Sequence, residues 1–306
     1  MNKKLIYFLN TLAMFFWGMS FVWTKIALNT YSPISLIFIR LLLSFPILFI
    51  IDAILKNPLL IKNNDLYFFM GLAFFEPFLY FLGENFGIQY LSSAVASIII
   101  ATIPVITPIF SYLFYKEKLT KSIIIGLMMS LFGLSLIIFK KNLMLRYSSK
   151  GIMLMFLAVL STMGYAVIVK KLSHKYNPLT ILKYQNLFGT LYFLPLFLIF
   201  EIKTFIHIQP KTNVILSIIC LSFLASSLSF VFYTLSIREI GMNLSSLMTN
   251  LIPIFTAIAS YFILDEQFNL QKIIGMILVI SGVFFEQIKN LKKLFIKSEP
   301  DFFRFS

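Results

Sequence analysis

The fold is decided by Glu84–Gly133, ENFGIQYLSSAVASIIIATIPVITPIFSYLFYKEKLTKSIIIGLMMSLFG, because this stretch recurs as Tyr233–Gly282, YTLSIREIGMNLSSLMTNLIPIFTAIASYFILDEQFNLQKIIGMILVISG. The two stretches align without a gap. The offset of 253 − 104 = 149 residues that separates the aligned prolines also separates a serine, a glutamate and two glycines from their counterparts: Ser97/Ser246, Pro104/Pro253, Glu117/Glu266, Gly126/Gly275 and Gly133/Gly282. Two unrelated apolar segments would not keep these residue types in register. The chain therefore contains two copies of one unit.

The composition is that of a membrane protein. Mean hydropathy is +0.90, and 12% of residues are charged, against about 25% in soluble chains. Ten apolar segments of roughly 18 to 23 residues are each long enough to cross the hydrocarbon core as a helix. They cover residues 5–27, 33–55, 66–88, 92–114, 121–139, 150–169, 179–200, 213–235, 243–263 and 270–288. We predict an all-α membrane protein with ten transmembrane helices.

The number of helices in each copy sets the orientation of the halves. Five crossings are an odd number, so two copies in series enter the membrane from opposite faces, which gives two inverted five-helix repeats. The predicted parts are a first repeat at 1–140, a linker at 141–149, a second repeat at 150–289 and a cytoplasmic tail at 290–306.

Basic residues indicate which side the termini occupy. With ten spans both termini share a side, and about 16 basic residues fall on that side against 8 on the other, as expected for a cytoplasmic location. This bias accounts for the net charge of +14 without a nucleic-acid partner. The Lys-, Ile- and Asn-rich composition suggests an AT-rich bacterial genome. We therefore predict an integral protein of the bacterial cytoplasmic (inner) membrane with both termini cytoplasmic.

Two acids in the third segment are the first candidates for a site. Glu76 and Glu84 lie at membrane depth, where a carboxylate is costly and is expected to face a hydrated cavity. Tyr80 shares their helical stripe, as do Gly83 and Gly87. We predict substrate contact for Glu76, Tyr80 and Glu84, and proton coupling through Glu84 with Glu76 in support.

Further polar and aromatic residues are candidates for the cavity wall. The predicted substrate-binding residues outside the third helix are Trp17, Ser20, Ser97, Tyr165, Tyr233, Ser246 and Asn250. Small and hydroxyl residues also let helices pack closely, so packing is the alternative for the serines. Core packing or a lipid-facing aromatic belt is the alternative for the aromatics.

Structural roles are predicted for a second group. Pro104 and Pro253 leave carbonyls unpaired and bend their helices at mid-membrane. Glu117 and Glu266 suit the N-terminal ends of the helices that follow them, where a carboxylate can bind free N–H groups. Arg40, seven residues into the second helix, is assigned to structure, with substrate contact left open. No metal or cofactor is predicted, because Cys220 is alone and His174 and His207 fall in loops on opposite sides.

The repeated pattern A-S-x(6)-P-x(12)-E-x(8)-G-x(6)-G resembles the EamA-type repeat of the drug/metabolite transporter superfamily. The second copy keeps it except for Ser245 at the alanine position, and Trp17-Gly18-x-Ser20-Phe21 with Arg40 also matches the first repeat of that family. The resemblance implies a ten-helix carrier in which the first, third, fourth, sixth, eighth and ninth helices enclose a cavity. Members commonly export amino acids, metabolites or toxic compounds.

The function predicted is a secondary transporter, exporting small organic solutes such as amino acids, metabolites or drugs by alternating access with proton coupling. Alternatives are a sugar-phosphate or nucleotide-sugar exchanger, disfavoured by acidic central charges, and a lipid-translocating membrane protein. An enzyme is not expected, since there is no HExxH motif and no Ser/His couple at membrane depth. The expected partners are a small-molecule solute and the lipid bilayer, and the expected state is a monomer or homodimer.

Overall fold

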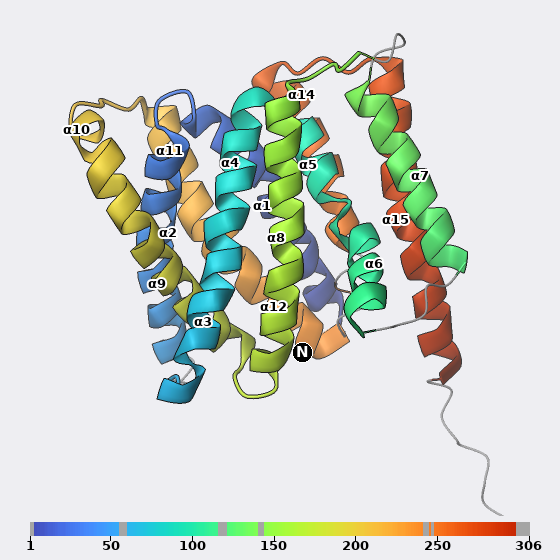
Figure 1. The fold of residues 1–306 in the computed structure, drawn as a ribbon, viewed down its shortest axis with the longest axis horizontal. Coiled ribbons are helices and arrows are strands. Elements are labelled where there is room, and N and C mark those ends of the chain that lie inside the picture. Colours follow the sequence, from blue (N-terminus) through green and yellow to red (C-terminus); the bar gives the residue numbers. More distant parts are fainter. Residues whose placement is uncertain are drawn as a thin grey trace, which may run out of the picture.

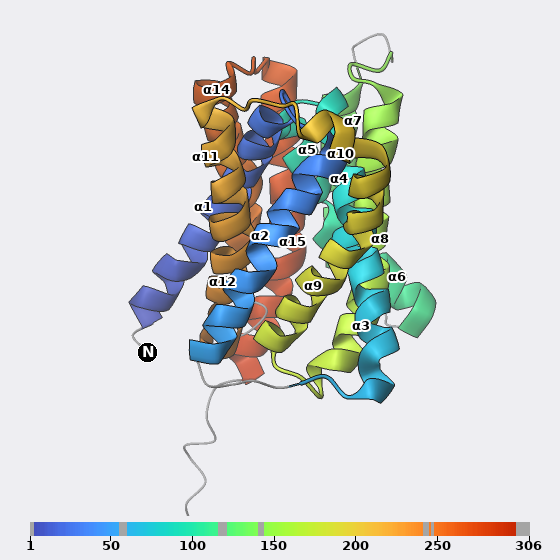
Figure 2. The ribbon, with the colours of Figure 1, turned by 90° about the vertical axis from the view of Figure 1, so that its left-hand side faces the viewer.

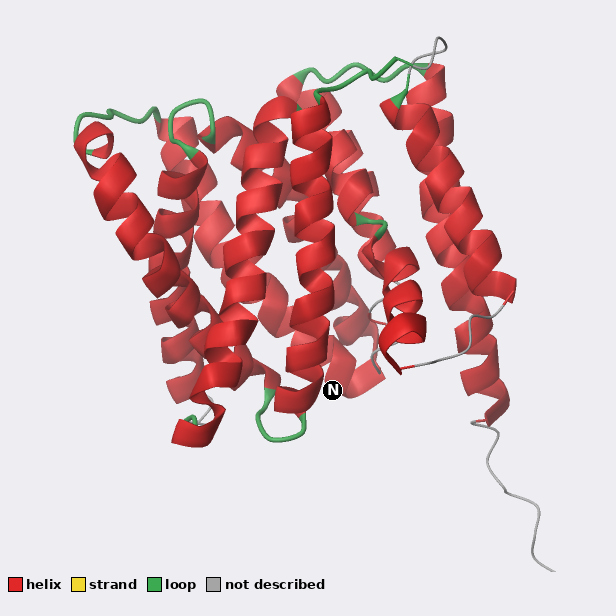
Figure 3. Cartoon of the chain, viewed as in Figure 1, coloured by secondary structure: helices red, strands yellow, loops and turns green. Residues whose placement is uncertain are grey.

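The computed structural model describes residues 3–54, 60–115, 121–139, 144–240, 245 and 248–297. Over these residues the chain is helical, and the only β-type pairing is an isolated bridge between Phe139 and Leu145 (Figure 3). The predicted all-α class is confirmed.

The first repeat contains the elements α1 (Lys3–Ala27), α2 (Pro33–Ile54), η1 (Asn63–Asp65), α3 (Leu66–Ala73), η2 (Phe74–Leu79), α4 (Tyr80–Tyr90), α5 (Ser93–Ile100), α6 (Ile103–Tyr115) and α7 (Lys121–Ile138). The second contains α8 (Ser149–Ser173), α9 (Pro178–Leu196), η3 (Phe197–Glu201), α10 (Ile202–Phe205), α11 (Thr212–Cys220), η4 (Leu221–Leu228), α12 (Ser229–Ile240), η5 (Met248–Asn250), α14 (Leu251–Leu264) and α15 (Leu270–Lys297).

Seven continuous helical stretches are long and apolar enough to cross a membrane: Lys4–Ala27, Pro33–Ile54, Asn63–Tyr90, Lys121–Ile138, Ser149–Ser173, Pro178–Phe205 and Thr212–Ile240. Three shorter apolar helices, Ser93–Thr107, Met248–Leu264 and Leu270–Phe285, fall where the sequence predicts the other spans. Each of the ten predicted segments therefore has a helical counterpart, although three of these are short.

The halves run in opposite directions. In Figure 1, α1 rises from the end that carries the N-terminus, whereas α8 begins at the other end and descends. The end of α15 returns to the side of the N-terminus. Viewed from the side in Figure 2, α2 and α9 of the two halves lie side by side at the front of the bundle. This arrangement agrees with an inverted repeat.

The contact between α7 and α15 shows how the halves are related. A Cβ added at Gly133 would lie 2.6 Å from the carbonyl oxygen of Gly275, and one added at Gly282 would lie 2.6 Å from that of Gly126. Since Gly126 and Gly275 occupy equivalent positions, as do Gly133 and Gly282, these are the same contact seen from each repeat, as in a two-fold interface. The Ser130 hydroxyl donates to the carbonyl of its own equivalent, Val279 (3.2 Å). A pseudo-two-fold axis thus passes between α7 and α15.

The fourth and ninth segments are interrupted. The predicted single helix at 92–114 is two helices, since α5 ends at Ile100 and α6 begins at Ile103, directly before Pro104. In the second half the short 3-10 turn η5 precedes α14, in which Pro253 is the third residue. A proline fits the first turn of a helix, where its missing N–H is not needed. The prolines therefore start new helices rather than bending continuous ones.

Two further differences concern the third and last helices. Gly83 and Gly87 do not share the face of Glu84, because Cβ atoms added there would lie 2.7 Å from Ala158 N and 2.6 Å from Met155 Sδ. Both glycines allow α4 to approach α8. The last helix, α15, continues to Lys297, so the predicted tail at 290–306 begins as helix, and residues 298–306 lie outside the described part.

Candidate functional site

A cavity of about 210 Å³ lies between the two halves. Its walls come from α1, α2, η2 and α4 to α6 of the first repeat, and from α8, α12 and α14 of the second. The lining residues are Trp17, Ser20, Phe21, Arg40, Glu76, Tyr80, Phe81, Glu84, Ile100, Ile103, Thr162, Phe230 and Ile252. Five of the predicted substrate-binding residues are among them: Trp17, Ser20, Glu76, Tyr80 and Glu84.

Glu84 is held by neighbours on its own helix. Its side chain is buried, with an exposed fraction of 6%. The Tyr80 hydroxyl donates to Oε1 at 3.3 Å, one helical turn away, and the Asn85 amide donates to Oε2 at 3.4 Å. Both contacts are long for hydrogen bonds to a carboxylate. Glu84 therefore keeps room for a stronger partner from the cavity.

Glu76 stands where the third transmembrane helix is broken. Its backbone angles, φ −144° and ψ 117°, leave the helical region, and it is followed by Pro77, which has no N–H. The break lies within the π-helical turn η2, a type of irregularity that often occurs at functional sites. The interruption brings Glu76 into the wall that Tyr80 and Glu84 form, so both acids face one cavity.

Arg40, for which a structural role is predicted with substrate contact left open, also lines the cavity. Its Nε donates to the Ser226 hydroxyl oxygen at 2.6 Å, and its guanidinium lies 4.3 Å from the centre of the Phe81 ring. Arg40 interacts electrostatically with Glu84 and Glu76. However, none of the ion pairs within 4 Å among the described residues involves it. The substrate-contact alternative is therefore open to it.

Aromatic rings complete the wall. The Trp17 indole N–H donates to the carbonyl of Ala225 at 3.1 Å, and its ring contacts Phe230 and Tyr233 at centroid distances of 5.0 and 5.2 Å. Ser20 donates its hydroxyl to the carbonyl of Trp17 (2.7 Å). The rings of α1 and α12 thus form one apolar side of a cavity whose other side carries the charges.

Other candidates lie elsewhere. Ser97 is fully buried, donates to the carbonyl of Ala94 (2.9 Å) and does not line the cavity, which favours the packing alternative for this serine. Tyr233 contacts the Trp17 ring but does not itself line the cavity. Asn250 is buried in η5 and is not among the residues that line the cavity. Tyr165 packs against the cluster around Phe69 and interacts electrostatically with Glu76. Ser246 and Glu117 fall outside the described residues.

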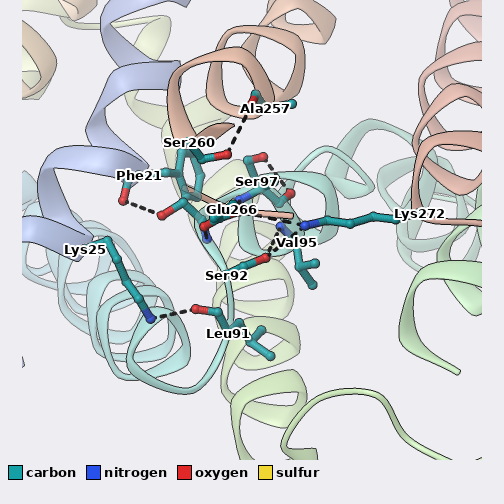
Figure 4. A network of polar contacts seen from close by, with 12 residues as sticks. Phe21, Lys25, Leu91, Ser92, Val95, Ser97, Ala257, Ser260, Glu266 and Lys272 are labelled. Carbon is teal, nitrogen blue, oxygen red and sulfur yellow. Dashed lines mark hydrogen bonds and ion pairs between the residues drawn. The ribbon is translucent and has the colours of Figure 1, made fainter. Parts of the chain in front are cut away.

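At the end of the bundle away from the N-terminus, Glu266 joins the two halves (Figure 4). Its Oε1 accepts from the backbone N–H of Ser93 at 2.6 Å and its Oε2 from that of Ala94 at 3.3 Å, while Lys272 lies at 3.8 Å. Glu266 therefore caps α5 of the other repeat, rather than the helix that follows it. The predicted capping chemistry is present, but on a different helix.

Lysines near that end are not simply solvated. The Lys25 ammonium donates to the carbonyls of Ile88 and Leu91, at 2.5 and 2.8 Å, where α4 ends. A cation is stabilising at a helix C-terminus. Lys25 and Lys272, which count among the basic residues on the side away from the termini, thus also hold helix ends together.

A set of polar residues between α2, α9 and η4 was not predicted from the sequence. Asp52 and Lys183 form an ion pair in which both side chains are buried. Further along the same helices, the Asn186 amide donates to the Ser44 hydroxyl (3.0 Å), which also contacts the Ser227 hydroxyl (3.0 Å). The sequence did contain an indication of this ion pair. Asp52 and Lys183 lie in apolar segments of opposite halves, and neither has a residue of opposite charge close enough on its own helix to pair with.

Among the described residues, no group of three or more His, Cys, Asp or Glu side chains could hold a metal ion. The site consists of two carboxylates, one guanidinium and an aromatic wall, between two oppositely directed halves of a helical membrane protein. These features define a membrane transporter built from an internal duplication.

The comparisons with known proteins identify the family. The model of the EamA-like transporter family matches residues 4–139 and 149–285, so the chain belongs to this family and the resemblance seen in the sequence is confirmed. The uncharacterized transporter YetK of Bacillus subtilis (strain 168) is 26% identical over 85% of this chain and 78% of its own length. An uncharacterized transporter of Archaeoglobus fulgidus is 27% identical over 95% of this chain and 99% of its own.

A solved crystal structure shares the fold. It superposes with a TM-score of 0.68 over 95% of this chain and 99% of the other, at 12% identity. At that identity the likeness concerns the fold alone.

Proposed function

We propose that the protein is a secondary transporter that exports a small organic solute bearing an amino group, such as an amino acid, an amine-containing metabolite or a drug. Ten membrane spans in two inverted repeats would expose the central site to each side in turn. The observation that carries this proposal is the cavity between the halves, where Glu76, Glu84 and Arg40 meet aromatic rings. Its volume of about 210 Å³ lies below that of pockets for drug-sized ligands, which favours the smaller solutes.

The charges in the wall favour a cationic or zwitterionic solute. Two carboxylates and one guanidinium line the cavity. A sugar phosphate would bring a dianion against Glu76 and Glu84, and Arg40 alone would have to compensate for that repulsion. The sugar-phosphate and nucleotide-sugar alternative is accordingly less well supported. A lipid-translocating role would need a polar stripe open to the bilayer, whereas these charges face an interior cavity.

Coupling to protons is proposed through Glu84, with Glu76 in support. One carboxylate can hold either a proton or the ammonium group of a solute, and competition between the two links their movements. The solute would leave unchanged, so we propose no enzymatic activity. We place the protein in a bacterial cytoplasmic membrane, with both termini cytoplasmic, as a monomer or homodimer.

The first prediction tests this function. Purified protein in proteoliposomes is offered a panel of amino acids, amines and other metabolites, and uptake is measured with and without an acidic lumen. We expect an acidic lumen to accelerate uptake of at least one amine-bearing solute, because protons leaving through Glu84 would drive the solute inward. Glu84→Gln should reduce this acceleration by about tenfold, equivalent to about 1.4 kcal/mol, and Glu76→Gln should reduce it less.

Glu201→Gln is the matched control, since Glu201 accepts from the Ser35 hydroxyl (3.3 Å) and does not line the cavity. An unchanged pH response in correctly inserted Glu84→Gln protein would refute the coupling and leave uniport or exchange. Absence of uptake for the whole panel would refute the proposed function.

A further inference from the structure

We propose that Ser226 is a positioning residue: it fixes the Arg40 guanidinium so that its outer nitrogens bind an anionic group of the solute, and thereby makes the site prefer zwitterions to simple amines. This inference rests on the proposed function and concerns the same cavity. Ser226 belongs to the second repeat and Arg40 to the first, so the binding site would depend on a contact between halves.

The contact uses the inner nitrogen of the guanidinium. Arg40 Nε donates to the Ser226 hydroxyl oxygen at 2.6 Å, and the two residues are only 5% and 2% exposed. Within the described part of the chain, the two outer nitrogens make no hydrogen bond or ion pair, and they are not sealed away from the cavity. A guanidinium held in this way presents its outer N–H pair, a geometry that suits two-point binding of a carboxylate.

Other elements hold the backbone of Ser226 in place. Ser226 lies in the π-helical turn η4, and the Ser44 hydroxyl of α2 donates to its carbonyl at 3.2 Å. Ser44 in turn accepts from the Asn186 amide of α9 (3.0 Å). Segments of both halves, η4, α2 and α9, therefore fix the backbone that carries the Ser226 side chain. Such support from neighbouring hydrogen bonds is what keeps a binding group in a precise geometry.

The surroundings keep Arg40 apart from the acids of the cavity. The Phe81 ring covers one face of the guanidinium at 4.3 Å. Glu84 and Glu76 interact with Arg40 electrostatically but form no direct ion pair with it. The cavity thus offers a cationic point and an anionic point that do not neutralise each other. A solute with both a carboxylate and an ammonium group matches this pair, whereas an amine satisfies only the acids.

Loss of the Ser226 hydroxyl would free Nε to seek a new partner. The carboxylates that interact electrostatically with Arg40 are Glu84 and Glu76, and an Arg40–Glu84 pair would remove both binding points. We therefore expect Ser226→Ala to weaken binding of carboxylated solutes by about tenfold relative to their decarboxylated amines, the scale for losing a hydrogen bond to a charged group. A purely structural serine would lower stability but leave this ratio unchanged.

The experiment measures the ratio directly in the full-length protein. Binding constants are determined for matched pairs, leucine with isopentylamine and phenylalanine with phenethylamine, in wild-type, Ser226→Ala and Ser227→Ala proteins. Ser227 is the matched control, because it is equally buried and hydrogen-bonded to Ser222 and Ser44 but does not touch Arg40. If Ser226→Ala does not fold, Ser226→Cys, with a weak hydrogen-bonding thiol of similar size, replaces it.

The inference predicts a wild-type preference for the amino acid of a pair, lost in Ser226→Ala and kept in Ser227→Ala. If the ratio of amino-acid to amine affinity is the same in wild type and Ser226→Ala, the inference is overturned. It is also overturned if Ser226→Ala and Ser227→Ala lose the preference for the amino acid equally. Wild-type protein that binds the amines with no preference for the amino acids also overturns it, but leaves the proposed function standing. Protein that binds no member of either pair, nor any other amine-bearing solute, overturns both.

Discussion

The Asp52–Lys183 pair is the one fully buried ion pair of the described chain, and it links α2 to α9. The Lys183 ammonium also lies 5.1 Å from the ring centres of Phe49 and Tyr184. A buried pair contributes little when compared with apolar residues of similar shape, but removal of one partner leaves an uncompensated charge, at a cost of about 3–5 kcal/mol.

We therefore expect Asp52→Asn to lower the thermal unfolding midpoint of the detergent-solubilised protein by several degrees, and Asp52→Leu combined with Lys183→Met to restore most of the loss. Fluorescence-detected size exclusion after heating measures both. Lys203→Met, at an exposed position of the short helix α10, controls for the loss of a lysine alone. An Asp52→Asn protein as stable as wild type would contradict the assignment.

At the level of single residues, the sequence identifies charged side chains that are costly to bury in the membrane, but it does not identify the residues that they contact. Glu76, Glu84 and Tyr80 were predictable because a carboxylate at membrane depth has few alternatives to a hydrated cavity. The contact between Arg40 and Ser226 was not predictable. It depends on which helices become neighbours and on the π-helical geometry of η4. The position of Ser97 outside the cavity lining was not predictable either, because a serine in a helix can satisfy its hydroxyl on its own backbone.

Among the elements, the close packing of α7 against α15 depends most directly on glycines, which have no side chain at the points of contact. Cβ atoms at Gly133 and Gly275 would lie 2.6 and 2.7 Å from the carbonyl oxygen of the opposite glycine. The backbones must separate to admit a methyl group, and overpacking of this kind costs about 1–3 kcal/mol. We expect Gly133→Ala and Gly275→Ala to lower the unfolding midpoint by similar amounts, because each added methyl group would meet the carbonyl oxygen of the other glycine at nearly the same distance.

The control is Gly71→Ala, whose added Cβ would meet only the tip of the Ile168 side chain, at 3.3 Å. Midpoints are compared by heating the three variants under one set of conditions. If Gly275→Ala is no less stable than Gly71→Ala, α7 and α15 do not approach as closely as described.

At the scale of elements, the positions of the helices were predictable from the sequence, whereas the breaks within them were not. Runs of apolar residues locate each helix because only a helix satisfies its backbone in lipid. The break at Glu76, the gap between α5 and α6 and the turn η5 need neighbouring groups to satisfy freed carbonyls. A proline pattern alone does not reveal these neighbours, which is why Pro104 was expected to bend a helix and instead begins one.

For the whole molecule, opposite directions of the halves predict which residues each side of the membrane can reach. Ser149 begins α8 at the end away from the N-terminus, and Lys175 follows the other end of the same helix. In a Cys220→Ser background, a membrane-impermeant thiol reagent applied to whole cells should label Ser149→Cys. Lys175→Cys should be labelled only after the membrane is opened.

A cysteine placed at Lys4, near the start of α1, should behave as Lys175→Cys does. Labelling of all three from the outside, or of Lys4→Cys and Ser149→Cys from the same side, would contradict inverted halves. The parent lacking cysteine supplies the background signal.

The paired glycines of α7 and α15 also bear on the origin of the protein. A contact that each half makes identically with the other needs no covalent connection, so a single five-helix ancestor inserted in both senses would already have assembled through it. Gene duplication and fusion would then have assigned one sense to each copy. From that point the copies were free to diverge, which accounts for acids at Glu76 and Glu84 where the later copy has Ala225 and Tyr233.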